Sequence, residues 1–482
     1  MEKLFNLING NLVEPISGQY LEVIEPAKGR VYALAPESDH QDAEHAVDAA
    51  QKAFSQWSAL SVQNRSEYML RLADLMERDT EILAAAESKD TGKPISVAKS
   101  VDIPRAISNI RFFATAILHF SSESHAMDGV AINYTLRQPI GSVVCISPWN
   151  LPLYLFTWKI APALAAGNCV IGKPSEVTPY TAYLFSKLCV EVGFPHGVIN
   201  ILHGRGAKVG SALVQHHDVK AVSFTGGTAT GAAIAAAVAP KFKKLSLELG
   251  GKNPTIVFDD CQFETTVKEV VRASFSNQGQ ICLCGSRILV QKGIYDRFKE
   301  AFLEEVKKLK VGDPNQPDTS FGALVSSEHI EKVISYIQLA KNEGGVLLTG
   351  GERLHLPAPL DKGYFLQPTV FEGLPYDCRT NQEEIFGPVL TLMPFEHEQE
   401  AVHYANSTKY GLAASVWTGE LGKAHRVAEK LQSGIVWINC WMLRDLRTPF
   451  GGIKDSGVGR EGGWEALRFF TEPKNVCIKY AK

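Results

Sequence analysis

Four short apolar runs, each closed by glycine, proline or serine, follow one another in the middle of the chain: IGSVVCIS (140–147), NCVIGKPS (168–175), GVINILHG (197–204) and AVSFTGG (221–227). Helix-like stretches such as TPYTAYLFSKLCVEVG separate them. Strands that alternate with helices are typical of βαβ units and of a parallel sheet. A second series begins at KNPTIVFDD and continues to about residue 449. The sequence therefore predicts an α/β protein with a parallel sheet.

The flanking segments predict elements of other kinds. Apolar residues recur at steps of three and four in residues 40–57 and 64–88, which predicts amphipathic helices. Asn64, with a glutamate three positions later, has the pattern of a helix cap. Residues 130–141 and 474–480 alternate apolar and polar and predict strands. The C-terminal strand is a natural edge for pairing with another subunit.

Length and composition narrow the class of protein. A chain of 482 residues is too long for one simple core, so two or three domains are expected. The net charge of −3 offers no basic field for nucleic acid. We find neither a secretory signal nor the run of about 18 apolar residues that a membrane helix needs. The nine cysteines lack disulfide or zinc spacing, which predicts a reducing, cytoplasmic setting and no metal.

Two cysteines stand out because their loop is polar. The stretch SNQGQICLCGSR (276–287) holds Cys282 and Cys284. A thiol nucleophile needs an oxyanion donor and a base. SPWN supplies the amide of Asn150, and LSLELGGKNP supplies the carboxylate of Glu248. From the residues alone these could also be three unrelated loops, since a lone glutamate before a glycine turn is more often structural.

Two further motifs suit a nucleotide. Gly226 and Gly227 follow a strand and precede an alanine-rich helix, whose N-terminus could accept a phosphate. Their spacing is not GxGxxG, so a simple tight turn is an equal alternative. In IGKPSE, Lys173 and Glu176 suit the hydroxyls of a ribose, and the carboxylate would favour NAD over NADP by repelling a 2′-phosphate. A surface ion pair is the simpler interpretation of these two residues alone.

A series of segments resembles the aldehyde dehydrogenase superfamily in order and spacing over essentially the whole chain. They are ISPWNLPLYLFTWKIAPALAAGN, IGKPSE, SFTGG, LELGGKNP, NQGQIC, EEIFGPV, KYGLAASVW and PFGGIKDSGVGREGG. The resemblance implies NAD as cofactor, a small-molecule aldehyde substrate and a homodimer or homotetramer. It also implies the fold of that superfamily: a Rossmann-like parallel-sheet NAD-binding domain (1–118 and 141–249), an α/β catalytic domain (250–449) and small β segments for bridging and oligomerisation (119–140 and 450–482).

The resemblance also implies residue roles. Cys282 attacks the aldehyde carbon, and its N–H and the Asn150 side chain hold the oxyanion. Glu248 activates the water that hydrolyses the thioester, and Glu461 would join a proton relay. Cys284 is then a neighbour without a catalytic role. The implied cofactor contacts are Ser147, Trp149, Lys173, Ser175, Glu176, Gly206, Gly210, Thr225, Gly226, Gly227, Leu249, Glu384 and Phe386. Many relatives carry serine where Gly227 stands, so one side-chain contact to a phosphate is missing.

Two segments rich in arginine bear on the substrate. DIPRAISNIRFF carries Arg105 and Arg111, and LRDLRTPFGG carries Arg444 and Arg447. The planar guanidinium group can bind both oxygens of a carboxylate, so converging arginines would select an acidic aldehyde. Solvated arginines, or arginines paired with neighbours such as Asp445, are the alternative.

Details of these segments resemble the superfamily members that oxidise muconic semialdehydes. The details are IPR followed by RFFA, CLC, NCW and RDLRTPFGG. In that group two arginines bind the substrate carboxylate, which implies Arg105 and Arg444, beside Asn150. The implied reaction converts 2-aminomuconate 6-semialdehyde to 2-aminomuconate in tryptophan breakdown through kynurenine.

Three alternatives to this reaction stay open. They are a broad-specificity or retinal-type aldehyde dehydrogenase, a silent binding or structural protein on the same fold, and an NAD-independent thiol esterase. The presence of Cys282 and Glu248 argues against the silent protein. The segments IGKPSE and EEIFGP argue against the esterase.

Overall fold

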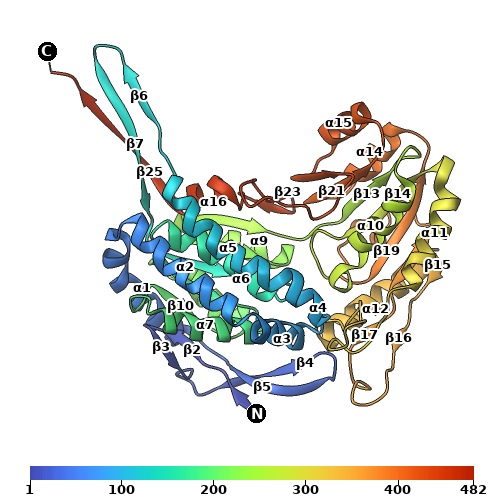
Figure 1. Ribbon diagram of the computed structural model, residues 1–482, viewed down its shortest axis with the longest axis horizontal. Coiled ribbons are helices and arrows are strands. Elements are labelled where there is room, and N and C mark those ends of the chain that lie inside the picture. The colour runs from blue at the N-terminus through green and yellow to red at the C-terminus, as the bar shows by residue number, and fades with distance from the viewer. Residues whose placement is uncertain (482) are drawn as a thin grey trace.

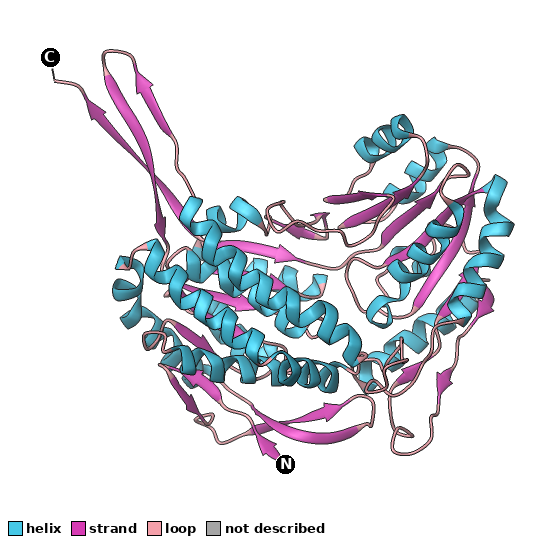
Figure 2. Ribbon diagram, in the orientation of Figure 1, coloured by secondary structure: helices cyan, strands magenta, loops and turns pink. Residues whose placement is uncertain are grey.

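The computed structural model describes residues 1–481 and shows two mainly parallel sheets (Figures 1 and 2). The strands of the first sheet are β2 (Asn6–Ile8), β3 (Asn11–Val13), β8 (Ser142–Ile146), β9 (Cys169–Lys173), β10 (Ile199–Ile201), β11 (Val219–Thr225), β12 (Lys244–Glu248) and β24 (Gly457–Val458). Their order is β24-β12-β11-β8-β9-β10-β2-β3. The five strands from β8 to β12 pair in parallel, which confirms the βαβ series predicted from the opening motifs.

Helices cover both faces of this sheet (Figure 1). They are α1 (His40–Ala59), α2 (Val62–Arg78), α3 (Thr80–Thr91), α4 (Ile95–Val97), α5 (Ile103–Ala116), α6 (Pro152–Ala165), α7 (Tyr180–Val192), α8 (Ser211–Gln215), α9 (Thr228–Val238) and α16 (Gly463–Phe469). Strands β8 and β9 are buried along their whole length, as expected for parallel strands with helices on both faces. Every residue of α6 is buried too.

The predicted helix over 64–88 differs from the structure in two ways. It is broken at Asp79, where α2 ends and α3 begins. The predicted cap at Asn64 is wrong, because α2 begins at Val62 and the Ser61 side chain accepts the Asn64 N–H at 3.1 Å. Serine and asparagine are both preferred N-cap residues, and only the position of the first turn distinguishes Ser61 from Asn64.

The order of the first sheet places a crevice at one edge. β8 lies between β9 and β11, and the chain proceeds outward from it in both directions. In doubly wound sheets a ligand binds at such a reversal, beyond the carboxyl ends of the strands. The residues after β8, β9 and β11 are therefore the ones that the topology brings together.

The second sheet comprises β13 (Asn253–Val257), β14 (Gly285–Gln291), β15 (Val346–Thr349), β18 (Thr369–Glu372), β19 (Val389–Phe395), β21 (Ala413–Trp417) and β22 (Ile435–Ile438). Their order is β15-β18-β19-β14-β13-β21-β22, parallel except for β15. Its helices are α10 (Phe263–Phe275), α11 (Tyr295–Lys307), α12 (Ser327–Asn342), α13 (Arg379–Gln382), α14 (Glu398–Asn406) and α15 (Leu421–Lys430). Residues 249–252 join the carboxyl end of β12 to the amino end of β13, so the two sheets meet at these edges.

A long β arm extends from the molecule (Figure 1). It contains β6 (Ser124–Met127), β7 (Ala131–Pro139) and β25 (Thr471–Lys479), in the order β25-β7-β6. The strands predicted at 130–141 and 474–480 are confirmed, and they pair antiparallel with each other. Pairing of this edge with another subunit stays a prediction.

The domain boundaries also stay a prediction. β24 pairs with β12, and α16 packs into the core of the first sheet. These contacts favour grouping residues 457–470 with the first sheet and leaving β25 alone with the arm.

The remaining strands form small sheets. They are β1 (Glu2–Lys3), β4 (Tyr20–Glu25) and β5 (Arg30–Pro36) in one, β16 (Arg353–Leu354) with β17 (Phe365–Leu366), and β20 (Tyr410–Gly411) with β23 (Ile453–Lys454). Over residues 1–481, none of the helices has both the length and the apolar character required to cross a bilayer.

Candidate functional site

The cysteine loop joins α10 to β14 at the edge where the two sheets meet. Asn277, Gln278 and Gly279 have φ values of 51°, 57° and 69°, so three consecutive residues adopt the left-handed conformation. Such a conformation is costly for residues other than glycine and is concentrated at functional sites. The Asn253 side chain holds the far end of the loop by donating to the Cys282 carbonyl at 2.6 Å. The loop is thus a constrained support for Cys282.

The two cysteines of the loop have different surroundings. Cys282 is half-buried and lines a cavity of about 220 Å³ together with Asn150. Cys284 is 7% exposed, lies behind Cys282 in an apolar cluster, and directs its Sγ toward the Ser276 carbonyl at 3.7 Å. Burial raises the pKa of the Cys282 thiol, and the carboxyls of Glu384 and Glu248 raise it further. The thiol is therefore protonated at neutral pH and needs a base before it can attack.

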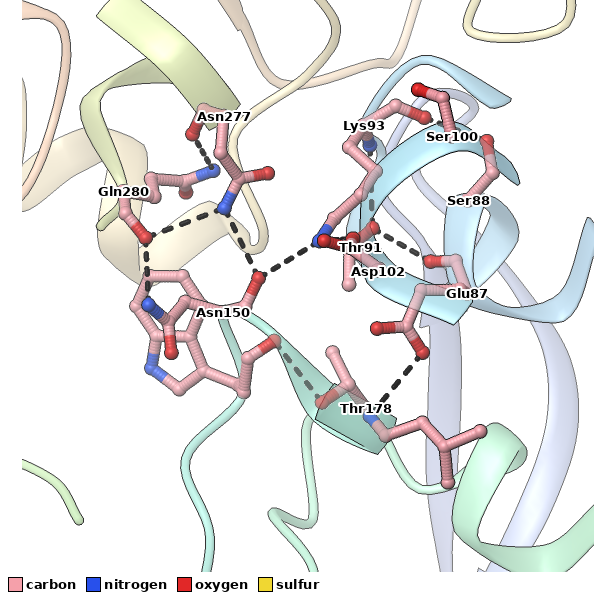
Figure 3. A network of polar contacts seen from close by, with 12 residues as sticks. Glu87, Ser88, Thr91, Lys93, Ser100, Asp102, Asn150, Thr178, Asn277 and Gln280 are labelled. Carbon is pink, nitrogen blue, oxygen red and sulfur yellow. Dashed lines mark hydrogen bonds and ion pairs between the residues drawn. The ribbon is translucent and has the colours of Figure 1, made fainter. Parts of the chain in front are cut away.

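Asn150 follows β8, and hydrogen bonds hold both its side chain and its main-chain carbonyl. Its Nδ2 donates to the Gln280 carbonyl at 2.8 Å. Its main-chain carbonyl accepts from Lys93 Nζ at 3.0 Å and from Asn277 Nδ2 at 3.1 Å (Figure 3). One Nδ2 hydrogen remains for a ligand, because an amide nitrogen carries two. The structure thus brings an amide donor and Cys282 to one cavity.

Glu248 ends β12 and is 4% exposed. Its Oε1 has no hydrogen-bond partner among residues 1–481. Burial raises the pKa of Glu248 well above its ordinary value, and the nearby Glu461 carboxyl raises it further. Glu461 pairs with Lys159 at 2.5 Å, and Lys159 also donates to Ser223 at 3.2 Å. The carboxyl of Glu248 therefore lies beside a buried chain of proton-carrying groups.

A groove of about 900 Å³ runs along the carboxyl ends of β8, β9 and β11, where the topology places a ligand. Ten of the predicted cofactor residues line it: Ser147, Trp149, Lys173, Ser175, Glu176, Gly206, Gly210, Thr225, Gly226 and Gly227. The hydroxyl groups of Ser147 and Thr225 are buried and have no partner within the described chain. Buried polar groups normally have partners, so these hydroxyls fit a polar ligand in the groove.

The glycine turn fits the phosphates of a dinucleotide. Gly226 is in a tight turn, where an added Cβ would lie 2.4 Å from Phe224 Cζ. Gly227 caps α9, and a Cβ there would meet no atom within 4 Å. Exposed N–H groups at a helix N-terminus donate hydrogen bonds to phosphate oxygens, and these two positions leave room for a phosphate. At the groove wall, Lys173 Nζ pairs with Glu176 at 2.9 Å while Lys173 is only 2% exposed, so a purely surface ion pair is the wrong interpretation.

The other three predicted cofactor residues, Leu249, Glu384 and Phe386, line the smaller cavity together with Cys282. Sequence reasoning missed His329 and Lys332, which α12 brings to the same wall. His329 Nε2 donates to the Phe386 carbonyl at 2.7 Å, and burial lowers the pKa of His329 to about 4. No local motif in α12 marks these residues, because their place depends on how the second half of the chain packs.

Arg105 and Arg444 converge on one aromatic wall. Each guanidinium carbon lies 5.5 Å from the centroid of the Trp158 ring. Arg444 Nη1 donates to the Tyr154 hydroxyl at 2.9 Å. Arg105 Nη2 is buried and unpartnered within residues 1–481. Sequence reasoning missed Tyr154 and Trp158, because aromatic residues on α6 have the pattern of core residues.

The other two arginines of these segments point elsewhere. Arg111 Nη2 contacts Asp74 at 2.8 Å, and Arg447 Nη2 pairs with Asp445 at 2.6 Å. Both pairs lie at the surface. The alternative of neighbour-paired arginines therefore holds for Arg111 and Arg447, whereas Arg105 and Arg444 remain available to a ligand.

Comparison with known proteins identifies the family. The aldehyde dehydrogenase family model matches residues 12–476, and the chain belongs to this family. An aldehyde dehydrogenase from Bacillus cereus, solved as an NAD complex, superposes with a TM-score of 0.97 at 39% identity, covering 100% of this chain and 97% of that one. The fold predicted from the sequence is thereby confirmed. The chain is an NAD-dependent enzyme that oxidises aldehydes.

The similar curated proteins have more specific names. The 2-aminomuconic semialdehyde dehydrogenase of Bos taurus is 51% identical over 480 residues, which are 99% of this chain and 98% of that protein. The 2-hydroxymuconic semialdehyde dehydrogenase of Pseudomonas sp. (strain CF600) is 45% identical over 485 residues, 99% of this chain and 100% of that protein.

Proposed function

We propose that this enzyme oxidises an aldehyde that already carries a carboxylate, and specifically 2-aminomuconate 6-semialdehyde to 2-aminomuconate. The observation that carries the proposal is the pair Arg105 and Arg444 on one aromatic wall, with Arg105 Nη2 buried and unpartnered. A desolvated guanidinium N–H without an acceptor is costly, and a carboxylate would satisfy it. The names of the relatives at 51% and 45% identity support the same substrate class.

The apolar surroundings of these arginines strengthen their preference for an anion. Arg444 also lies 3.9 Å from the centroid of the Phe450 ring, and Arg105 lies 5.3 Å from that of Tyr154. Burial lowers the pKa of Arg105, and the neighbouring Arg444 lowers it further. Two like charges held close together in a poorly solvated wall repel each other. An anion bound between them would offset this repulsion. A long apolar aldehyde such as retinal would leave both charges uncompensated.

In this proposal the Cys282 thiol gives its proton to Glu248, and the resulting thiolate attacks the aldehyde carbon to form a thiohemiacetal. The N–H of Cys282 and the amide of Asn150 hold the developing oxyanion, which is the largest electrostatic contribution in acyl-transfer sites. NAD, when bound, accepts the hydride that leaves this carbon. Glu384, Phe386 and the groove residues would hold the cofactor.

The second half of the reaction is hydrolysis of the Cys282 thioester. Glu248 accepts a proton from the attacking water, and the acid product leaves as Cys282 is restored. Burial and Glu461 raise the pKa of Glu248, so it can hold the proton that it takes from the Cys282 thiol. It must release that proton before acting as a base, and Glu461 with Lys159 offers a route for it.

The cellular setting is part of the same proposal. We place the enzyme in the cytoplasm, in tryptophan breakdown through kynurenine, as a homodimer or homotetramer that assembles through the β arm. The division into an NAD-binding domain, a catalytic domain and bridging segments belongs to this proposal too.

A steady-state assay tests the substrate class. Purified enzyme with NAD is given 2-hydroxymuconic semialdehyde, a more stable analogue of the amino compound, or retinal, or hexanal, and NADH is followed by absorbance. We expect the acidic semialdehyde to have the highest kcat/KM. Higher kcat/KM for retinal or hexanal would contradict the proposal and favour a broad-specificity or retinal-type enzyme.

A further inference from the structure

Three ionisable side chains lie fully buried behind Asn150 (Figure 3). Glu87 lies near the end of α3, Lys93 follows that helix, and Asp102 precedes α5; each is 0% exposed. Lys93 Nζ and Asp102 Oδ2 are 2.5 Å apart. A buried ion pair of this kind seldom stabilises a protein more than apolar residues of the same size would. Its presence beside the site therefore calls for a reason other than stability.

The ammonium group of Lys93 makes a second contact that reaches the site. It donates to the main-chain carbonyl of Asn150 at 3.0 Å. The same oxygen accepts from Asn277 Nδ2 at 3.1 Å, so the segment after α3 and the cysteine loop both hold it. The Asn150 side chain is tied to Gln280 of that loop at 2.8 Å. One charged and two neutral hydrogen bonds thus determine where the Asn150 amide points.

Of the three hydrogen bonds, the one from the charged Lys93 ammonium group belongs to the strongest type. A hydrogen bond from a charged donor is roughly twice as strong as a neutral one. Asn150 lies in the loop between β8 and α6, where no strand or helix bonds fix its backbone. Without the ammonium group the peptide can rotate about its remaining contacts. A misplacement of about 1 Å at a catalytic group costs about 100-fold in rate.

We propose that Lys93, held by Asp102, is a positioning residue that sets the orientation of the Asn150 amide toward the oxyanion on the Cys282 adduct. Lys93 itself touches neither substrate nor cofactor. The inference rests on the proposed oxyanion role of Asn150. Asp102 holds the ammonium group in place through the ion pair, and it immediately precedes the helix that carries Arg105, so the same pair also ties the substrate arginine to the oxyanion site.

The state of Glu87 is consistent with this arrangement. Burial raises the pKa of Glu87 to about 8, with Lys93 opposing and Asp102 adding to the shift. Burial also raises the pKa of Asp102, with Lys93 opposing that shift, and it is Asp102 that contacts the ammonium group. Glu87 Oε2 accepts the Leu153 N–H at 3.5 Å, in the first turn of α6, and makes no hydrogen bond to Asn150 itself.

A double-mutant cycle tests whether Lys93 acts through Asn150. Lys93→Met keeps the length of the side chain and removes the charge, and Asn150→Ala removes the amide. We expect K93M to lower kcat about 10-fold or more in the wild-type background and less than about twofold on N150A, because coupled residues are not additive. KM for NAD should change little in all variants. Lys89→Met, an exposed lysine four residues earlier, is the matched control and should keep wild-type kcat.

A second variant separates positioning from folding. Lys93→Met with Asp102→Leu removes both charges, so no unpaired buried ion destabilises the fold. We expect its melting temperature to lie near the wild-type value while kcat stays as low as in K93M. Wild-type kcat in this variant, or an equal loss from K93M with and without Asn150, would overturn the proposal. If N150A itself kept wild-type kcat, the oxyanion role of Asn150 would be wrong, and so would the positioning role of Lys93.

Discussion

The guanidinium groups of Arg105 and Arg444 lie at the same distance, 5.5 Å, from the centroid of the Trp158 ring, although the two residues are far apart in the chain. Helix α5 supplies one and the loop before Phe450 supplies the other. Trp158 is 2% exposed and gives neither arginine a charged partner. In the proposed function this shared wall makes the two charges a single anion-binding unit, and Arg444 lies close enough to Glu248 and Cys282 to lower the pKa of both.

Tyr154→Phe tests how the wall orients Arg444. The substitution removes the hydroxyl that accepts from Arg444 Nη1 at 2.9 Å and keeps the ring. A hydrogen bond of this kind contributes about 1 kcal/mol, so KM for 2-hydroxymuconic semialdehyde should rise about fivefold. KM for NAD should not change, and steady-state kinetics measure both. An unchanged KM for the acidic substrate would show that Tyr154 does not orient Arg444.

Gly227→Ser tests the cofactor groove. A Cβ at Gly227 meets no atom within 4 Å, so the serine fits, caps α9 and adds a hydroxyl for a phosphate. We expect the Kd for NAD, measured by calorimetry, to fall about fivefold, in line with about 1 kcal/mol for one added hydrogen bond.

Gly226→Ser is the matched control for this change. Its Cβ would lie 2.4 Å from Phe224 Cζ, so the turn must shift and NAD binding should weaken. If both serines changed the Kd in the same direction, the assignment of the phosphate to the N-terminus of α9 would be wrong.

The pKa of Cys282 predicts how its reactivity depends on pH. Burial, with Glu384 and Glu248, raises this pKa, and only the thiolate is nucleophilic. In the absence of NAD, the rate of Cys282 alkylation by iodoacetamide should therefore still increase above pH about 8.5, the pKa of an ordinary thiol. Mass spectrometry of the peptide, with Cys282→Ser as background, gives the rate. A plateau below neutral pH would contradict the raised pKa.

Glu87→Gln tests the buried charges behind Asn150. Burial raises the pKa of Glu87 from 4.5 to about 8, so the folded chain binds this proton more tightly than the unfolded chain. The stability that results is complete below pH 4.5 and is lost as the pH rises toward 8. The melting temperature of E87Q relative to wild type should therefore increase across this window. If the melting temperatures of the two proteins changed in parallel with pH, the pKa of Glu87 would not be raised by folding.

Local motifs offered the reacting groups and four positions of the cofactor groove, each with a simpler alternative, and the resemblance implied the other groove residues. The strand-then-glycine pattern around Gly226 and the short step from Lys173 to Glu176 are defined by neighbouring residues, so the sequence carries them directly. The resemblance then placed Cys282, Asn150 and Glu248 together, and the fold brings Cys282 and Asn150 to one cavity.

The missing parts of the site come from distant segments. A buried lysine such as Lys93 has the same sequence pattern as a solvated one, and only the packing of α3 against the Asn150 loop reveals its role. Trp158 on α6 has the pattern of a core residue. It does pack in the core, but its ring also contacts Arg105 and Arg444. His329 reaches the cofactor side because α12 packs there. Long-range packing of this kind leaves no periodic signal in the chain.

The measurement that tests the central claim most directly is the substrate selectivity of Arg444→Met. The claim is that Arg444 binds a substrate carboxylate, so the variant should lose about 2 kcal/mol or more of binding to the acidic substrate. This predicts a fall of about 30-fold in kcat/KM for 2-hydroxymuconic semialdehyde and little change for hexanal. Arg447→Met, whose arginine pairs with Asp445 at the surface, should leave both values unchanged. An equal loss for both substrates in R444M, or no loss for the acidic one, would contradict the claim.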